Sequence, residues 1–492
     1  MTDTADFFRA RLDQMIDPRH PLLVLESHMP WQEIETALGR RFERQTRRGK
    51  NLKGMDLFGF TTTVVSAGSS NAGRPRLSLR LMASLLYLKH AFNESDEGVC
   101  HRWGETPAWQ YFSGEDYFEN RPPCDPSSIS RFRRLLGEEG VEELLARTIS
   151  VAVTMKLIDA QELATVIVDS TVQPKAIAYP TDSRLLETAR QKLVDAAKAV
   201  GIAFKQTYAK EGAVLSRKAG RYAHARQFHR MKKAISRQRT ILGRLARHVE
   251  RCKASLPQHQ QDSLASVLDK VWRIAEQSRQ KKAVKGQPKL YSWHAPEVSC
   301  ISKGKARQPY EFGVKVGIAT TLRGNLIVGA RSFAGNPYDG HTLAEQIEQA
   351  TILMQETDVQ PTTVYTDLGY RGVDKENPNI RLNHRGKFKR LTPQERQQLK
   401  RRQAIEPMIG HLKHDHRMER CHLKGQLGDA IHAVLCAAGY NIKWLLRMIV
   451  RYGLRAFLRL FFAPQSGLQD RNRRPIIGFL SQQSTTHAVA VW

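Results

Sequence analysis

Apolar residues along the first 150 positions recur every three or four residues. This helical spacing is clear from Glu33 to Phe42 and from Leu77 to Phe92. Asp125, which precedes a proline, is a typical helix N-cap and predicts a helix from Ile129 to Leu144. The pattern therefore predicts a helical N-terminal region over residues 1–150.

Short runs of β-branched residues replace the helical spacing after residue 160. Ala164 to Val168 predicts a central strand that is buried on both faces. Tyr310 to Thr320 and Leu326 to Ser332 predict a β-hairpin. A predicted helix from Thr342 to Gln355 and a predicted strand from Thr362 to Thr366 follow. This succession of strands and helices predicts an α/β core with a mixed sheet.

The segment between the first strand and the hairpin has no strand pattern. Residues from about 183 to 285 are rich in Ala, Arg, Lys and Gln, which favour helices. Within 201–250, 13 Lys or Arg residues stand against two acidic residues, a net charge of +11. The predicted domains are a helical N-terminal domain at 1–150, an α/β core at 160–182 and 295–425, a basic α-helical insertion at 183–294, and a C-terminal helical region and tail at 426–492.

The whole chain is strongly basic. Its 492 residues include 77 Lys and Arg against 48 Asp and Glu, a net charge of +29. A polyphosphate releases counterions when it binds such a surface, so nucleic acid is the expected partner. The length exceeds what one compact core supports, which predicts several domains.

A membrane or secreted location fits the sequence less well. The most apolar stretch, Ile431 to Phe462, is interrupted by five Lys or Arg residues and predicts basic amphipathic helices. The N-terminus lacks the basic and apolar segments of a secretion signal. The six cysteines are scattered without a Cys-x-x-Cys pair, which indicates a reducing cytoplasm.

Three acidic side chains are candidate metal ligands. Asp169 and Asp367 each follow a predicted strand, and Glu406 lies in a predicted helix close to its start or at a kink, because Pro407 follows it. Neighbouring strand ends meet at one edge of a sheet, so the three carboxylates can converge there. Oxygen ligands suit Mg²⁺, and two such ions support attack on a phosphodiester. Alternatively, the aspartates form turns and Glu406 makes a surface ion pair.

Basic and aromatic residues near these acids are candidate DNA contacts. Arg402 precedes Glu406 by four residues and Lys413 follows it by seven, so helical periodicity places the three on one face. Tyr370 and Arg371 follow the second aspartate, where they can support a displaced base or simply pack.

Other candidates lie further from the acids in sequence. Lys315 alternates with apolar residues of its strand and faces either DNA or solvent. Arg131 and Arg134 lie near the start of a helix that could enter a major groove, or they belong to a solvated helix face. His341 follows the predicted hairpin in a polar loop that also contains Asp339, and it is a possible active-site neighbour.

A dense group of potential ligands follows Glu406. His411 and Asp415 are one helical turn apart, within a stretch that also contains His414, His416, Cys421 and His422. The spacing matches no closed tetrahedral metal site. We therefore expect structural or phosphate-contacting roles for this group.

Taken together, the acidic segments resemble the DDE-type transposases of bacterial insertion sequences, in the insertion-sequence-five branch. The matching motifs are Val168-Asp169-Ser170-Thr171, Asp367-Leu368-Gly369-Tyr370-Arg371-Gly372 and Arg402-x3-Glu406-x6-Lys413. The likeness covers residues 25–180 and 295–450. Leu399 stands where the family signature has a tyrosine, and the insertion follows the first strand instead of the fifth.

The resemblance implies a ribonuclease H-like core, action on the terminal inverted repeats of the chain's own element, and Mg²⁺ or Mn²⁺ as cofactor. Asp169 is expected to bridge two ions, while Asp367 and Glu406 each complete one. Water would first cut the transposon end, and the freed 3′-hydroxyl would attack target DNA. Because two DNA ends are held at once, we expect a dimer on double-stranded DNA, associated with the nucleoid in a bacterial cytoplasm.

Two other functions stay open at the level of sequence. A ribonuclease H-like nuclease would share the metal site but would not join DNA strands. A non-catalytic basic DNA-binding protein would make the three carboxylates incidental.

Overall fold

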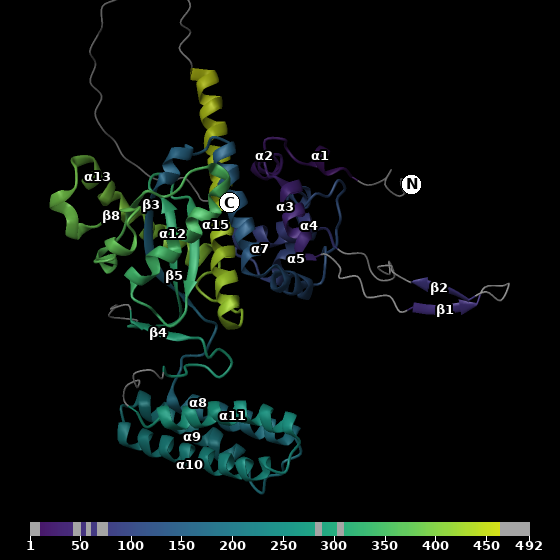
Figure 1. Cartoon of the computed structure of the whole chain (residues 1–492), viewed down its shortest axis with the longest axis vertical. Coiled ribbons are helices and arrows are strands. Elements are labelled where there is room, and N and C mark those ends of the chain that lie inside the picture. Colours follow the sequence, from purple (N-terminus) through teal and green to yellow (C-terminus); the bar gives the residue numbers. More distant parts are fainter. Residues whose placement is uncertain are drawn as a thin grey trace, which may run out of the picture. The chain divides into compact units, whose positions relative to one another are not determined.

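The computed structural model describes residues 10–42, 51–55, 61–65, 77–280, 288–302 and 309–462. The chain divides into two compact units, residues 1–449 and residues 450–492. The first unit contains the helical N-terminal region, the sheet and the helical insertion, and Figure 1 labels most of their helices and strands.

Helices dominate the N-terminal region. They are α1 (Leu12–Met15), α2 (Pro21–Glu26), α3 (Trp31–Gly39), α4 (Leu79–Ala91), α5 (Asp96–Glu105), α6 (Pro107–Phe112) and α7 (Pro126–Thr154). The three predicted helices are confirmed in α3, α4 and α7. Asp125 caps α7 as predicted, since its carboxylate accepts a hydrogen bond from the Ser127 backbone N–H. α4 is buried from Leu81 to Ala91 and forms the centre of this region.

The N-terminal region also contains two strands, so the prediction of an entirely helical region was wrong here. β1 (Asn51–Met55) pairs antiparallel with β2 (Thr61–Val65). The sequence of β2 consists of β-branched Thr and Val residues, which favour extended backbone. The strands are short and lack alternating apolar and polar positions, so periodicity alone did not reveal them.

A six-stranded mixed sheet forms the described part of the α/β core. Its strands are β3 (Thr165–Pro174), β4 (Ser299–Ser302), β5 (Tyr310–Thr321), β6 (Ile327–Phe333), β7 (Thr363–Tyr365) and β8 (Arg381–Asn383). The order is β4-β5-β3-β7-β8, with β6 also paired to β5. β5 is antiparallel to β3, β4 and β6, whereas β7 is parallel to both β3 and β8. The prediction of an α/β core with a mixed sheet is confirmed.

The central strand β3 is longer than the sequence pattern predicted. Val166, Ile167 and Val168 are fully buried, as expected for a strand covered on both faces. Pairing with β5 continues past Asp169 to Pro174. Asp169 therefore lies in the middle of the strand, and its predicted position at the strand end was wrong. Polar residues occupy much of the second half, and they hid it from a pattern based on apolar runs.

Long helices pack against the sheet and link it to the N-terminal region. α12 (Leu343–Leu353) contacts β5 and β6, and α15 (Gly425–Phe462) carries Asn441. The Asn441 amide accepts from the Ile327 backbone N–H, donates to the Ile327 carbonyl and donates to Thr148 of α7. One buried side chain therefore joins β6, α7 and α15.

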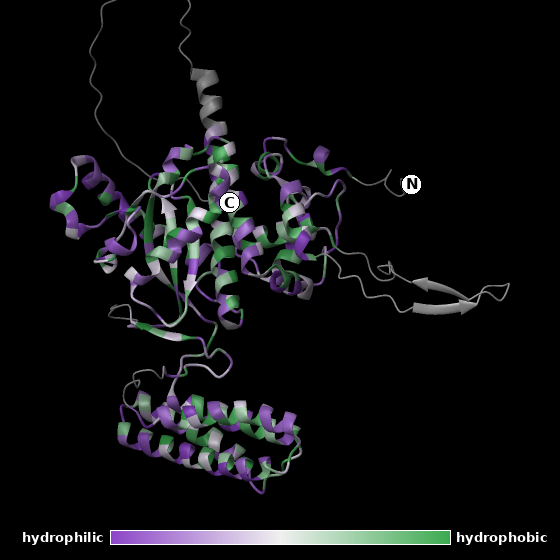
Figure 2. Ribbon diagram, viewed as in Figure 1, coloured by the Kyte–Doolittle hydropathy of each residue, from purple (hydrophilic) through white to green (hydrophobic). Residues whose placement is uncertain are grey.

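α15 is strongly apolar because it is a core helix. Among the described residues, Gly425–Gly453 is the one helical segment long and apolar enough to cross a membrane. However, 72% of its apolar window is buried inside the protein. Figure 2 shows hydrophobic residues along the described part of this helix. The burial accounts for the apolar composition without a membrane.

The insertion contains four helices within its described residues. They are α8 (Asp182–Ala199), α9 (Ala209–His224), α10 (Phe228–Lys253) and α11 (Gln258–Gln277). Leu193, Ile241 and Val271 belong to an apolar cluster that is separate from the main core. Figure 2 shows hydrophilic and hydrophobic residues interspersed along these helices. The segment after the first strand is thus helical, as predicted, and has an apolar cluster of its own.

Short helices follow β8 and carry the third acidic residue. They are α13 (Pro393–Arg401), η9 (Arg402–Ala404) and α14 (Ile405–Asp415). Glu406 lies in the first turn of α14, which confirms the expected helix start, because a proline directly after it is tolerated there. Arg402 belongs to the preceding 3₁₀ turn and not to α14, yet its guanidinium still lies 3.8 Å from the Glu406 carboxylate four residues later.

Candidate active site

Asp169 lies within β3, and Asp367 follows the neighbouring parallel strand β7. β3 and β7 pair with Thr165 opposite Thr363 and Ile167 opposite Tyr365. Asp169 lies two residues beyond Ile167, and Asp367 lies two residues beyond Tyr365. Adjacent strands are about 4.8 Å apart. The two aspartates thus lie at the same level, each two residues beyond the last residue that pairs β3 with β7.

The Tyr370 side chain lies near the carboxylates of three aspartates. The ring is fully buried, and burial raises the pKa of the hydroxyl well above its ordinary value. The neighbouring carboxylates of Asp339, Asp169 and Asp367 raise it further, in that order. Three acidic groups therefore lie near one phenol. The buried ring is placed for packing at this cluster, one of the two roles that the sequence left open.

Gly369 allows two of these carboxylates to come close to the backbone. Its N–H donates to Asp367 Oδ1 over 2.8 Å. A Cβ atom on Gly369 would stand 3.0 Å from a carboxylate oxygen of Asp367 and 3.0 Å from one of Asp339. A larger side chain would crowd both acids, which explains glycine at this position. Asp339 consequently belongs to the acidic cluster.

Lys315 holds Asp339 in place. Its ammonium group lies 2.9 Å from Asp339 Oδ1 and 2.6 Å from the Pro337 carbonyl oxygen. Lys315 is only 9% exposed. Lys315 was predicted to face DNA or solvent. In the structure it forms an internal ion pair with Asp339 instead.

His341 was the residue that the sequence favoured in the loop after β6. It is exposed, and its ring packs edge-on against Tyr338 at 5.5 Å between centroids. Asp339, two residues earlier, is the side chain that reaches the other acids. Sequence reasoning missed this role because a loop Asp-Gly pair has no periodic pattern, and only the buried partner Lys315 distinguishes it.

Arg402 links the first and third acids. One guanidinium nitrogen lies 3.2 Å from Asp169 Oδ2, and another lies 3.8 Å from Glu406 Oε1. The Asp169 and Arg402 side chains are mostly buried, whereas the Glu406 side chain is 67% exposed. Asp169 also accepts from the Ser170 N–H over 2.8 Å. The third carboxylate is thus the one most accessible from solvent.

The remaining predicted DNA contacts differ in exposure. Lys413 on α14 forms a 3.6 Å ion pair with Glu311 of β5. Arg371 is exposed directly after Tyr370. Arg131 and Arg134 are exposed near the start of α7, where Arg131 also donates to the Ser127 hydroxyl. These last three guanidinium groups are accessible to a polyanion.

The carboxylate cluster fits a hard divalent cation by its chemistry. Its donors are all oxygens, which Mg²⁺ and Mn²⁺ prefer. The acids of Asp169, Asp367 and Glu406 do not all approach within 4.8 Å of one another. The cationic Arg402 instead contacts two of them.

The histidine-rich stretch after Glu406 forms pairs, not a ligand cluster. His411 lies 2.7 Å from Asp415, and His414 lies 3.3 Å from Glu419. In the part of the chain that the structure describes, this stretch brings no three potential ligand atoms within 4.8 Å of one another. The geometry supports the structural roles expected from sequence.

Two models of known protein families match segments of the N-terminal region and of the region around the third acid. Residues 55–135 match a family model described as a transposase domain (DUF772), and residues 370–446 match a model described as a transposase DDE domain. The second match includes Arg402, Glu406 and Lys413. The chain is 40% identical over 223 residues to the uncharacterized protein ORF8 in the nfe locus of Rhizobium meliloti.

That alignment covers 45% of this chain and 95% of the relative. No solved structure matches the chain significantly. One transposase model matches part of the helical N-terminal region. The other matches the segment around the third acid. The chain therefore belongs to the DDE-type transposases.

Proposed function

We propose that this transposase cuts and joins DNA at a site formed by Asp169, Asp367 and Glu406, after binding the terminal inverted repeats of its own element. The observation that carries the proposal is that Asp169 and Asp367 each lie two residues beyond the last paired residues of the adjacent parallel strands β3 and β7. Arg402, in contact with both Asp169 and Glu406, brings the third acid to the same place.

The strand order supports a ribonuclease H-like core. Three antiparallel strands, β6, β5 and β3, lie beside two strands, β7 and β8, that run parallel to β3. The sequence motifs support the insertion-sequence-five branch. We propose that the helical N-terminal domain at 1–150 binds DNA and that the α/β domain at 160–182 and 295–425 is catalytic. The helical insertion at 183–294 and the C-terminal region at 426–492 are the other two proposed domains.

Two Mg²⁺ or Mn²⁺ ions are the proposed cofactors, and when bound they would activate the attacking oxygen and neutralise charge on the leaving oxygen. The chain supplies the scaffold for this chemistry. Backbone N–H groups of Ser170 and Gly369 orient the carboxylates of Asp169 and Asp367. Lys315 neutralises Asp339 next to them.

The remaining cations supply the proposed DNA-binding surface. Arg131, Arg134 and Arg371 are exposed, and many Lys and Arg side chains of α9 and α10 are exposed as well. Arg402, Lys413, Lys315 and Tyr370 would act closer to the acids, by positioning them and the bound phosphate. Two DNA ends require two active sites, so we propose a dimer on DNA in the bacterial cytoplasm, at the nucleoid.

Strand cleavage by purified Asp169→Asn tests the proposal. Asparagine keeps the size of the side chain but removes its charge, so cleavage of end DNA in Mg²⁺ or Mn²⁺ should fall to background. Binding to the same DNA should stay close to wild type. Asp195→Asn on the exposed face of α8 is the matched control and should cleave normally. Cleavage by Asp169→Asn at the wild-type rate would overturn the proposed site.

Strand transfer is tested with DNA ends that have already been cut. Wild-type protein should join their 3′-hydroxyls to target DNA in one step. Cleavage without any joined product would indicate a nuclease instead. Binding without either reaction would indicate a non-catalytic DNA-binding protein.

A further inference from the structure

A second group of potential metal ligands lies away from the acidic cluster. His90 belongs to α4, whereas His432 and Cys436 belong to α15. One ligand atom from each of the three side chains lies within 4.8 Å of the others. His90 is 1% exposed, His432 is 6% exposed and Cys436 is fully buried. The group therefore joins two core helices that are far apart in sequence.

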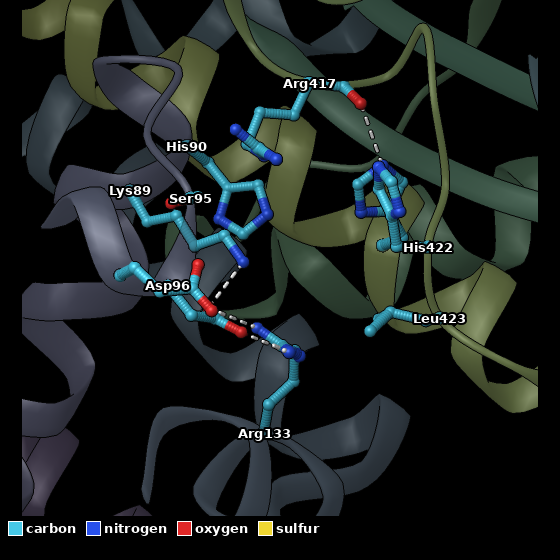
Figure 3. Close-up of a pocket in the computed structure, with 10 residues that line it drawn as sticks. Lys89, His90, Ser95, Asp96, Arg133, Arg417, His422 and Leu423 are labelled. Atoms are coloured by element: carbon cyan, nitrogen blue, oxygen red, sulfur yellow. Dashed lines mark hydrogen bonds and ion pairs between the residues drawn. The ribbon is translucent and has the colours of Figure 1, made fainter. Parts of the chain in front are cut away.

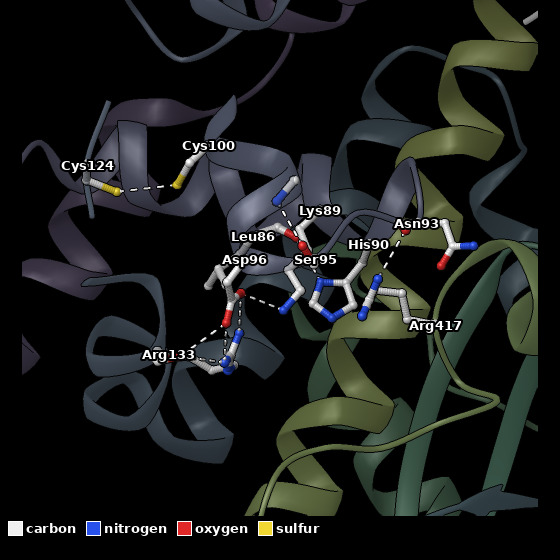
Figure 4. Close-up of polar contacts among 12 residues, drawn as sticks. Leu86, Lys89, His90, Asn93, Ser95, Asp96, Cys100, Cys124, Arg133 and Arg417 are labelled. Carbon is white, nitrogen blue, oxygen red and sulfur yellow. Dashed lines mark hydrogen bonds and ion pairs between the residues drawn. The ribbon is translucent and has the colours of Figure 1, made fainter. Parts of the chain in front are cut away.

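Each imidazole already has one nitrogen engaged with a backbone carbonyl. His90 Nδ1 lies 2.9 Å from the Leu86 carbonyl oxygen, a contact drawn in Figure 4. His432 Nε2 lies 3.0 Å from the Arg417 carbonyl oxygen. A carbonyl oxygen only accepts, so these nitrogens carry the ring protons. The lone pairs consequently lie on His90 Nε2 and His432 Nδ1.

This arrangement is the one that metal-binding histidines use. A carbonyl that accepts from one ring nitrogen fixes the tautomer and orients the other nitrogen toward the ion. Burial keeps both rings neutral, since it lowers the pKa of His90 well below its ordinary value and that of His432 to about 3. Neutral imidazole is the form that binds metals.

We propose that His90, His432 and Cys436 bind one Zn²⁺ ion that fastens α4 to α15. Two nitrogens and one sulfur form a borderline-soft donor set, which suits Zn²⁺ and not Mg²⁺. His432 and Cys436 are four residues apart, so one helical turn presents both to the same point.

A neighbouring cavity supplies a route to the site. It has a volume of about 340 Å³ and is lined by His90 and His432, together with Arg417, His422 and Leu423. Figure 3 draws the residues that line this cavity, with His90, His422 and Leu423 labelled. A metal ion can enter through it, and a water molecule from it can complete a fourth coordination position.

Local charges must accommodate the ion. Lys89, Arg133 and Arg417 lie nearby, and the first two are paired with Asp96 at 2.6 and 3.0 Å (Figures 3 and 4). Burial raises the pKa of the Cys436 thiol well above its ordinary value, so Zn²⁺ binding must displace its proton to solvent. The thiolate formed cancels one of the two charges on the ion.

The ion would stabilise the fold without taking part in DNA cleavage. The acidic cluster offers oxygen donors for hard cations, whereas this site offers nitrogen and sulfur. The two sites can therefore be filled and tested separately. Without an ion, the two rings would simply pack edge to face, 6.0 Å apart, and the thiol would behave as a small apolar group.

Cobalt titration of the full chain tests the proposal. The protein is stripped with a chelator and then titrated with Co²⁺ in excess Mg²⁺, which keeps the acidic cluster occupied. We expect one equivalent of Co²⁺ to produce a thiolate-to-cobalt charge-transfer band that Zn²⁺ abolishes. Only a thiolate ligand gives this band, so carboxylate-bound Co²⁺ does not contribute.

Variants identify the thiol. Cys436→Ala and His432→Ala should lose the band, whereas Cys100→Ala should keep it. Cys100 is a matched control because it is also buried, with its sulfur 3.9 Å from that of Cys124 (Figure 4). Zn²⁺ should raise the Tm of the wild type but not that of Cys436→Ala. Absence of the band in the wild type, or its persistence in Cys436→Ala, would overturn the proposal even if the variants fold poorly.

Discussion

The guanidinium of Arg402 lies 3.2 Å from the carboxylate of Asp169, although 233 residues separate them in the chain. Both side chains are mostly buried, so this contact is shielded from solvent. It places a fixed positive charge beside the acid that we propose as the central metal ligand. The same charge can hold a phosphate but also competes with a cation for Asp169.

Substitution of Arg402 should therefore change metal binding and cleavage in opposite directions. We expect Arg402→Met to bind Mn²⁺ more tightly, because the competing charge is gone. Cleavage should nevertheless fall about 100-fold, the usual effect of losing one preorganised electrostatic group. Manganese titration and single-turnover cleavage of end DNA measure the two effects.

Lys400→Met serves as the control for Arg402→Met, since Lys400 is an exposed cation just before it. The Lys400→Met variant should change neither the affinity for Mn²⁺ nor the rate of cleavage. If Arg402→Met bound Mn²⁺ more weakly than the wild type, Arg402 would not be a competitor for the acids.

Salt dependence tests the role of the insertion in DNA binding. Arg226, Lys232 and Lys233 are exposed near and on α10. Each phosphate contact contributes about 0.9 to the slope of log affinity against log salt concentration. Reversing the three charges to Glu should flatten the slope by up to about 3, as measured by fluorescence anisotropy over a salt series.

A matched charge change elsewhere in the insertion controls for net charge. The exposed residues for this control are Lys192, Lys198 and Lys205, each changed to Glu. This variant should retain a slope close to that of the wild type. Equal slopes in both triple variants would show that Arg226, Lys232 and Lys233 do not contact phosphate.

A buried ion triad fastens the end of β3 to α15. The Lys175 ammonium lies 2.7 Å from Glu297 and 2.7 Å from Asp429, and all three side chains are less than 10% exposed. Lys175→Met would leave two buried carboxylates without a counter-ion, which costs about 3 to 5 kcal/mol. We expect a loss of this size in the free energy of unfolding, measured with urea.

The control for the triad is Lys192→Met, an exposed lysine of α8. Its effect should stay within about 0.5 kcal/mol. A similarly small loss in Lys175→Met would mean that the triad does not stabilise the fold.

His20 should make stability depend on pH through one helix cap. Its Nδ1 accepts a hydrogen bond from the Leu22 N–H at the start of α2, and burial lowers its pKa. Because the folded pKa lies below the unfolded value of about 6.5, the contribution is present above that pH and is lost on acidification. An asparagine side chain at the same position would cap the helix at every pH.

The His20→Asn variant should thus gain stability relative to the wild type as the pH falls from about 8 to about 5. The cap contributes about 1 kcal/mol, which sets the size of the change. Urea unfolding of both proteins across this range measures it. A difference that stays constant with pH would rule out protonation of His20 as its cause.

Local patterns were sufficient for most elements of the core. The apolar runs of β3 and β7, the hairpin of β5 and β6, and the Asp125 cap of α7 depend on residues close in sequence. Pro407 likewise indicated that Glu406 lies near a helix start. These features are set by backbone preferences and by hydrophobic periodicity, which a single sequence carries.

Contacts between distant segments required the tertiary structure. The continuation of β3 past Asp169 depends on pairing with β5, and the place of Asp339 depends on buried Lys315. The sequence directed attention to the histidines after Glu406, whereas the ligand group formed between His90 and α15.

The sequence by itself determined the type of core, the basic insertion and the acidic motifs of a transposase. Only the tertiary structure decided which charged groups face one another, such as Arg402 with Asp169 and Lys175 with Glu297. The reason is physical: secondary structure follows from neighbours along the chain, whereas a buried charge selects its partner from whatever the folded chain brings within a few ångströms.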